Sequence, residues 1–120
     1  MKRIIILLAV SLVFFISSCD IGDTVYEKST WKYEVTGTAL TVNITMNNKN
    51  GNTVRYSSIN IPWSVSFNRY NMYSFSAYIS AQNNNHSGNI IVKIYRNGKE
   101  VKSATGSGAH AIVTTYYNYD

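Results

Sequence analysis

The sequence predicts an all-β domain, an immunoglobulin-like antiparallel β-sandwich of about seven strands. From residue 31 onward, short runs alternate apolar and polar side chains, which puts every second residue on one face of a strand. Clusters of Asn, Gly and Ser separate most of these runs. No window beyond residue 18 carries the 3.6-residue apolar period of an amphipathic helix. Seven or eight short strands fit a two-sheet sandwich, and a small closed barrel is the alternative.

The first expected strand covers residues 31–35 and is ended by Gly37. The next carries four apolar residues spaced two apart, all expected on its buried face: Leu40, Val42, Ile44 and Met46. Residues 47–52 form a turn cluster, in which Asn50-Gly51 suits a backbone with positive φ.

The alternation changes parity in the strand that follows. Val54 and Tyr56 share one parity, whereas Ile59 and Ile61 have the other, so we expect a β-bulge between Tyr56 and Ile59. Pro62 cannot donate a ladder hydrogen bond and is expected at an edge or a corner.

The second half of the chain repeats the same pattern. Alternating rows are expected in residues 63–67, 73–81 and 90–94, and a last strand is expected after the turn at 106–108. Asn97-Gly98 is typical of a tight hairpin that leads into residues 99–105.

The N-terminal segment is typical of a bacterial lipoprotein signal. Lys2 and Arg3 precede an apolar run, and Ile16-Ser17-Ser18-Cys19 ends it with small residues and the one cysteine of the chain. The run is shorter than the roughly 20 residues of a membrane-spanning helix. We therefore expect residues 1–18 to be a signal peptide, Cys19 to carry palmitate-type acyl chains, residues 19–30 to be a tether, and 31–120 to be the domain.

The signal indicates an exported protein of the bacterial cell envelope, and the charge and cysteine content indicate which partners and cross-links to expect. The formal net charge of +5 includes Lys2 and Arg3, and the other basic residues are scattered along the chain. We expect no nucleic-acid partner, mild attraction to anionic head groups or glycans, and membrane attachment through lipid. The pattern does not choose between inner membrane, outer membrane and cell surface. With Cys19 acylated, no disulfide is expected.

Candidates for catalysis and metal binding are few, so we expect no enzyme, no metal and no cofactor beyond the lipid. His86 lies in an Asn-rich loop, and His110 is expected on a strand far from it. Glu34 and Glu100 are expected on solvated strand faces. The turn around Ser107 lacks the spacing of a nucleophile elbow.

Outward-facing aromatic residues are the best binding candidates. Alternation predicts an exposed patch that includes Tyr78, Ile91, Tyr95, Tyr116 and Tyr117. In the alternative interpretation, these side chains pack over the second sheet or under the tether.

Several short motifs, taken in order, resemble a known family. They are Tyr33-Glu34-Val35-Thr36-Gly37, Ile61-Pro62-Trp63-Ser64, Ser80-Ala81-Gln82-Asn83, Ile94-Tyr95-Arg96-Asn97-Gly98 and Ser107-Gly108. Together they resemble the MmpS family, small membrane-anchored partners of the mycobacterial RND-type lipid and siderophore exporters called MmpL. The resemblance implies an immunoglobulin-like domain facing the periplasm and a non-catalytic accessory role. It also implies structural roles for the motif residues Pro62, Trp63, Ser64, Asn97, Gly98, Ser107 and Gly108.

Two features differ from the resembled family. Its members are generally tethered by a transmembrane helix, whereas a lipid anchor is expected here. Mycobacterial members often carry a cysteine pair in their last strands, and the nearest positions here are Val92 and Thr115.

Together these observations predict a lipid-anchored accessory or binding protein with a protein partner in the envelope, one that assists a transporter. The alternative is a carbohydrate-binding surface lipoprotein whose exposed tyrosines stack on sugar rings. A third interpretation is a structural lipoprotein without a ligand.

Trp63 itself has two interpretations. We expect it to fill the core between the sheets, with Pro62 setting a bend, although this step could instead present a loop to a partner.

Overall fold

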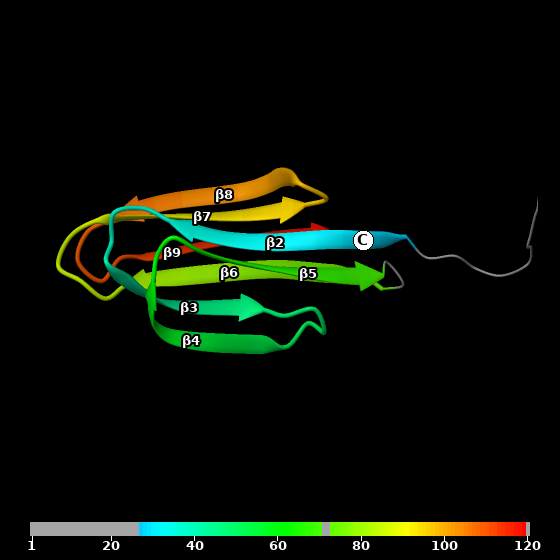
Figure 1. Cartoon of the computed structure of the whole chain (residues 1–120), viewed down its shortest axis with the longest axis horizontal. Helices are drawn as coiled ribbons and strands as arrows, with labels where there is room; N and C mark the ends of the chain where they lie inside the picture. The colour runs from blue at the N-terminus through cyan, green and yellow to red at the C-terminus, as the bar shows by residue number, and fades with distance from the viewer. Residues whose placement is uncertain (1–26, 71–72, 120) are drawn as a thin grey trace, which may run out of the picture.

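A computed structural model describes residues 27–70 and 73–119, which form eight antiparallel strands in two four-stranded sheets (Figure 1). The strands are β2 (Lys28–Thr36), β3 (Thr41–Asn47), β4 (Thr53–Asn60), β5 (Trp63–Tyr70), β6 (Phe75–Asn83), β7 (Asn89–Arg96), β8 (Lys99–Ser107) and β9 (Ile112–Tyr119). The all-β prediction is confirmed, with eight strands where about seven were expected. The predicted signal peptide and Cys19 lie outside the described residues.

The strands stack as two layers. One sheet has the order β5-β2-β7-β8 and the other β4-β3-β6-β9. Within residues 27–70 and 73–119 no strand pairing joins the two sheets, so the sandwich is confirmed over the closed barrel. The architecture is that of immunoglobulin domains, but the strand order differs from their ABED and CFG sheets.

The domain begins earlier than the sequence pattern indicated. β2 starts at Lys28 and Ser29 is fully buried, so residues 28–30 belong to the sandwich and not to the tether. The sequence pattern did not show this start, because Ser29 and Thr30 are both small and polar, so no apolar residue marks the inward-facing position. All eight strands and the buried core lie between Lys28 and Tyr119. A chain that starts at Asp20 therefore contains everything that the sandwich buries.

The core is formed by the inward rows of both sheets. Its buried members are Trp31, Tyr33, Val35, Ala39, Val42, Ile44, Met46, Phe75, Ala77, Ile79, Ala81, Ile90, Val92, Ile94 and Val113. Burial of these rows, at about 25 cal/mol per Å² of apolar surface, is the main stabilising contribution. Leu40 and Tyr73 share the parity of the rows but are exposed, because each lies just before its strand begins.

Tyr33 joins the two sheets through its hydroxyl group. From β2 it donates to the Asn47 carbonyl at 2.7 Å and accepts from the Tyr78 amide at 3.2 Å. The β3–β6 pairing ends at Met46 and Ile79, so the Tyr78 amide lies just beyond the reach of β3. The hydroxyl therefore partners two backbone groups at the point where a strand ends.

The predicted bulge in β4 is confirmed. Val42 pairs with Ile59 and Ile44 with Tyr56, so the register shifts between the two pairs. Ser58 takes a φ of 56° there, and its amide donates to Asn43 Oδ1 at 3.0 Å. The extra residue returns Ile59 to the inner face.

Pro62 lies at a corner, as predicted. Ile61 and Pro62 join β4, the edge of one sheet, to β5, the edge of the other. Trp63 then opens β5 on the inner row, half-buried, with its ring centroid 5.8 Å from that of Tyr56. Trp63 thus packs against the margin of the core and does not fill it, while Ser64 on the opposite parity is exposed.

The sandwich has two ends of different character (Figure 1). At one end the chain enters β2 and leaves β9, beside the turns 48–52 and 97–98 and the start of β6; we call this the entry end. The far end holds the connections 37–40, 61–62, 84–88 and 108–111, none of which contains Lys, Arg, Asp or Glu.

Asparagine side chains fix the loops of the far end. Buried Asn83 donates to the carbonyls of Ser87 and Gly108 at 2.9 and 3.0 Å. Asn85 Oδ1 accepts the Leu40 and Thr41 amides at 3.2 and 3.1 Å. Because these bonds satisfy backbone groups that no strand reaches, they hold the loops in one arrangement.

Candidate functional site: a basic cleft at the entry end

The structure divides the predicted aromatic patch between opposite sides of the molecule. Ile91 and Tyr95 lie on β7, on the outer face of one sheet. Tyr78 and Tyr116 lie on β6 and β9, on the outer face of the other. The expectation of one patch is therefore wrong, because the sequence pattern gives the parity of a side chain but not the sheet to which its strand belongs.

Tyr95 is engaged by its own neighbours. Its hydroxyl donates to Glu34 Oε1 at 3.0 Å, and the Lys32 ammonium lies 5.2 Å from the centre of its ring. Desolvation, followed by the hydrogen bond to Glu34, raises the pKa of Tyr95 above its usual value. A surface ion pair at 3.4 Å joins Lys93 to Glu100 nearby, and the hydrogen bond between them raises the pKa of Lys93.

Tyr117 faces the core and is partly buried against it, so it does not lie on the outer face of its sheet. It pairs with Ala77 on the inner row, and its ring centroid lies 6.1 Å from that of Trp31. Val113 lies on the same strand with the same parity as Tyr117, so both side chains point to the same face, and Val113 is buried. That spacing was the signal which could have placed Tyr117 correctly.

Tyr78 and Tyr116 are direct cross-strand partners on the outer face of their sheet. Tyr116 is 60% exposed, and Tyr78 is half-buried. A hydroxyl pair flanks them on one side, where Ser80 Oγ and Thr114 Oγ1 lie 2.8 Å apart, and on the other side Ser76 Oγ donates to Asn118 Oδ1 at 2.7 Å. Of the five predicted residues, only these two come together on an open surface.

The predicted hairpin motif is confirmed. Asn97 and Gly98 have φ values of 53° and 80°, as a two-residue type I′ turn requires. Asn97 also holds the start of β2 in place through two hydrogen bonds. Its Oδ1 accepts a hydrogen bond from the Thr30 amide at 2.9 Å, and its own amide donates to the Thr30 carbonyl at 2.7 Å.

The Ser107-Gly108 step also has structural contacts at the far end. Ser107 ends β8, and the Gly108 amide donates to the Gly88 carbonyl at 3.1 Å. The motif residues thus lie at turns and corners of the fold.

The two histidines lie together, contrary to expectation. The connections that carry them meet at the far end, where the His86 and His110 ring centroids are 6.0 Å apart. His110 is in a turn with a φ of 56°, not on a strand. Among the described residues no three His, Cys, Asp or Glu side chains gather as metal ligands would.

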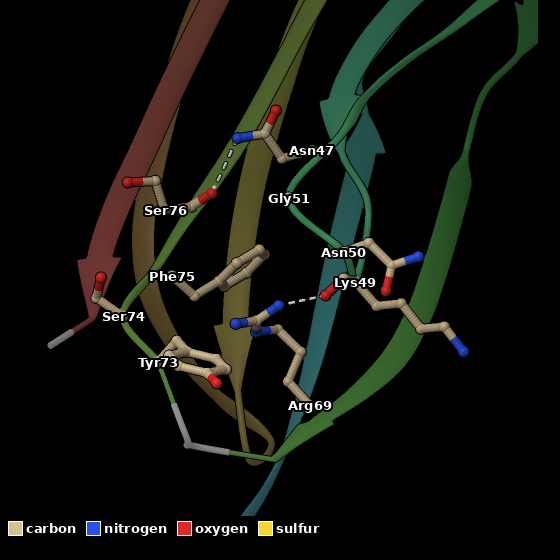
Figure 2. A pocket seen from close by; sticks show the side chains of 9 residues that line it. All are labelled: Asn47, Lys49, Asn50, Gly51, Arg69, Tyr73, Ser74, Phe75 and Ser76. Atoms are coloured by element: carbon tan, nitrogen blue, oxygen red, sulfur yellow. Dashed lines mark hydrogen bonds between the residues drawn. The ribbon is translucent and has the colours of Figure 1, made fainter.

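A cleft of about 420 Å³ opens at the entry end between the β3–β4 turn and the start of β6 (Figure 2). Its described lining residues include two cations, several polar residues and two aromatic rings but no acidic side chain: Asn47, Lys49, Asn50, Gly51, Arg69, Tyr73, Ser74, Phe75 and Ser76. A second cleft of about 300 Å³ shares Lys49, Asn50, Arg69 and Tyr73 and adds Asn68 and Tyr70.

Arg69 is the central residue of this cleft. It stands on the inward row of β5, opposite Ser29, at the point where the strand leaves the core. Its guanidinium lies over the Phe75 ring, 4.1 Å from the centroid, and donates to the Lys49 carbonyl (Figure 2). Stacking and hydrogen bonding together fix the plane of the guanidinium.

Sequence reasoning missed this cleft. Arg69 follows the alternating row expected in residues 63–67, and it meets Lys49 and Phe75 only because β5, the β3–β4 turn and the start of β6 fold together. A run of Asn-Arg-Tyr followed closely by Tyr73 was the available signal, since Arg and Tyr are enriched at binding surfaces.

Comparison with known proteins decides the family. A family model described as Mycobacterium membrane protein matches residues 16–116, nearly all of the chain. The chain belongs to this MmpS-type family. No curated protein matches it. Among residues 27–70 and 73–119 of this MmpS-type chain, no helix is long and apolar enough to cross a membrane.

The family assignment also bears on the positions nearest to the cysteine pair of the resembled family. Val92 and Thr115 are both buried, and they lie on the inner rows of opposite sheets, facing the same core. In this MmpS-type domain, the two positions nearest to the cysteine pair are therefore occupied by a buried valine and a buried threonine.

Proposed function

We propose that this MmpS-type protein is a lipid-anchored, non-catalytic accessory protein of the cell envelope that assists a transporter. The family match over residues 16–116 carries the proposal, because it indicates membrane association. The sequence of residues 1–19 supports acylation of Cys19 as the means of attachment. Fold alone would not support a role.

The position of the chain's entry point supports a definite orientation. Residues 20–27 separate Cys19 from β2, a span of at most about 30 Å when fully extended. An acylated Cys19 would therefore keep the entry end near the bilayer and turn the far end away from it. The far end presents Leu40 and Ile112, which are 73% and 65% exposed, close to loops fixed by asparagines. A rigid, uncharged surface with exposed apolar side chains suits contact with a protein.

Crosslinking in intact membranes tests this role. We expect the wild-type protein to capture a transporter subunit, and Leu40→Ser with Ile112→Ser to lose it. Arg55→Gln, on an exposed strand position, serves as the matched surface control and should retain the partner. Capture of no transporter by the wild type would contradict the role. Equal capture by the double variant would contradict the far-end contact.

One observation favours carbohydrate binding as a second candidate function. The Tyr78–Tyr116 pair sits on an outer face bordered by Ser80 and Thr114, without a charged side chain among these four. Tyrosine rings beside hydroxyl groups suit stacking against sugars. Glycan-array binding that is lost in Tyr116→Ala but kept in Tyr95→Ala would support this function, and absence of binding to any glycan would exclude it.

A further inference from the structure

We propose that the Arg69 cleft at the entry end is a binding site for a phosphate ester, such as the head group of an anionic phospholipid. The site itself follows from the geometry of the described residues. Only the choice of a lipid as its source rests on the anchoring proposed above.

The first argument is the uncompensated charge of Arg69. In the part of the chain that the structure describes, the ion pairs are Lys32–Glu34 and Lys93–Glu100, and neither includes Arg69. Among the described residues its guanidinium donates one hydrogen bond, to the Lys49 carbonyl, which leaves further guanidinium donors for a ligand. A half-buried cation that has no counterion among residues 27–70 and 73–119 attracts an anion.

The second argument is the chemistry of the lining. The planar guanidinium is held against Phe75. Its N–H groups are therefore already oriented for bidentate hydrogen bonds to a phosphate, and binding costs little side-chain entropy. The Tyr73 hydroxyl lies beside the guanidinium in the same cleft and supplies a neutral hydrogen-bonding group (Figure 2), whereas the Ser76 hydroxyl donates to Asn118 Oδ1 at 2.7 Å. A volume of about 420 Å³ accommodates a head group of this size.

The third argument is the distribution of charge along the molecule. Five basic residues lie at the entry end: Lys28, Lys49, Arg69, Arg96 and Lys99. The acidic residues described at this end are Glu27 and Glu100, of which Glu100 is paired with Lys93. The far-end connections contain no Lys or Arg, and the acidic Glu34 lines a cleft with Pro62 there, so the positive potential is concentrated where the chain enters.

The fourth argument is the exposure of the aromatic residues beside the cleft. Tyr70 and Tyr73 are 63% and 75% exposed, and both line the second cleft with Lys49. Figure 2 shows the Lys49 side chain extending away from the guanidinium, so its charge lies beside the site and not within it. Tyrosines next to lysine and arginine are typical of the boundary between membrane and water.

The test uses the ectodomain of residues 20–120, which contains the whole sandwich. Binding of glycerol 3-phosphate is measured by calorimetry. Flotation is measured with phosphatidylcholine vesicles that contain or lack phosphatidylglycerol. We expect Arg69→Gln to weaken binding about tenfold, the loss of one charge-assisted hydrogen-bonding group. The affinity of Arg69→Lys should lie between those of the wild type and Arg69→Gln, because lysine keeps the positive charge but lacks the planar, two-pronged donor geometry of the guanidinium.

Lys102→Gln is the matched control, because it makes the same change in net charge on β8, an edge strand of the sandwich. We expect it to change binding less than twofold. Equal weakening by Arg69→Gln and Lys102→Gln would overturn the proposal, since it would show diffuse attraction without a site. Binding of neither glycerol 3-phosphate nor phosphatidylglycerol vesicles would also overturn it.

The two arms of the experiment identify the source of the phosphate ester. Arg69-dependent binding to phosphatidylglycerol vesicles supports a lipid head group. Arg69-dependent binding to glycerol 3-phosphate without vesicle binding supports a soluble phosphate ester at the same site. If Arg69→Gln fails to fold, amide shifts of the wild type on titration with glycerol 3-phosphate decide the matter. Shifts confined to residues 48–52 and 73–76 support the site, and shifts elsewhere contradict it. The ectodomain carries no Cys19, so failure here leaves acylation and transporter binding to their own tests.

Discussion

Replacing Tyr33 with phenylalanine should remove the polar link between the two sheets. The hydroxyl contacts the Asn47 carbonyl at 2.7 Å and the Tyr78 amide at 3.2 Å, and the Tyr33 side chain is fully buried. The variant leaves both backbone groups without this partner, and each buried group left unpaired costs about 1–3 kcal/mol. The variant no longer buries a polar hydroxyl group, and this gain offsets part of the cost of the two unpaired backbone groups. We therefore expect a loss of about 2 kcal/mol in the free energy of unfolding and a fall in Tm of roughly 10 °C.

The same substitution has a signature in alkaline solution. Burial raises the pKa of Tyr33 to about 12 from its usual value of 10.0. Below pH 10 the hydroxyl is protonated in both states. Between pH 10 and 12 the unfolded chain loses the proton while the folded chain retains it, so stability falls as the pH rises. The wild type should lose about 2–3 kcal/mol over this window through Tyr33, and Tyr33→Phe should not.

Urea denaturation of the ectodomain at pH 7, 10 and 12 measures both effects. The difference in stability between wild type and Tyr33→Phe should be large at pH 7 and should largely disappear at pH 12. Tyr116→Phe is the matched control, because its hydroxyl is on an exposed side chain, and its stability should follow the wild type throughout. A Tyr33→Phe variant as stable as the wild type at pH 7, or a difference that does not change with pH, would refute this reasoning.

Two further substitutions test the turns. Gly37→Ala should destabilise the domain by more than about 2 kcal/mol in thermal denaturation, because its Cβ would lie 2.2 Å from the Asn89 carbonyl oxygen at a φ of 132°. Gly51→Ala, also at positive φ but with no atom within 4 Å of the added Cβ, should cost only about 1 kcal/mol; equal losses would show that the close contact is unimportant. Asn97→Ala should cost about 2 kcal/mol by urea denaturation, through the strained turn and the lost Thr30 contact, and a change below about 0.5 kcal/mol would contradict that role.

The predictable part of the fold is the part fixed by local pattern. The parity change after Tyr56 predicted the bulge, and Asn97-Gly98 predicted the hairpin, because both depend on neighbours in sequence. The prediction that Leu40 is buried was wrong, because an alternating row does not show where its strand begins. Parity likewise did not reveal the strand order of the sheets, which depends on contacts between distant segments.

The functional surface was harder to predict for the same reason. Tyr95 and Tyr78 have equivalent patterns in sequence, yet they lie on opposite sheets. The Arg69 cleft needs β5, the β3–β4 turn and the start of β6 in one place. His86 and His110 meet only because two far-end connections converge. Sequence pattern gives the orientation of a side chain on its strand, whereas a site requires the relative positions of several strands.

The attachment of the protein to the membrane is the claim on which its proposed orientation depends. Intact-mass analysis of the protein extracted from membranes tests it most directly. The account predicts a chain that begins at Cys19 and carries acyl groups, and a Cys19→Ala variant that retains residues 1–18 without acylation. A wild-type chain that keeps residues 1–18, or one with an unmodified Cys19 thiol, would contradict the account.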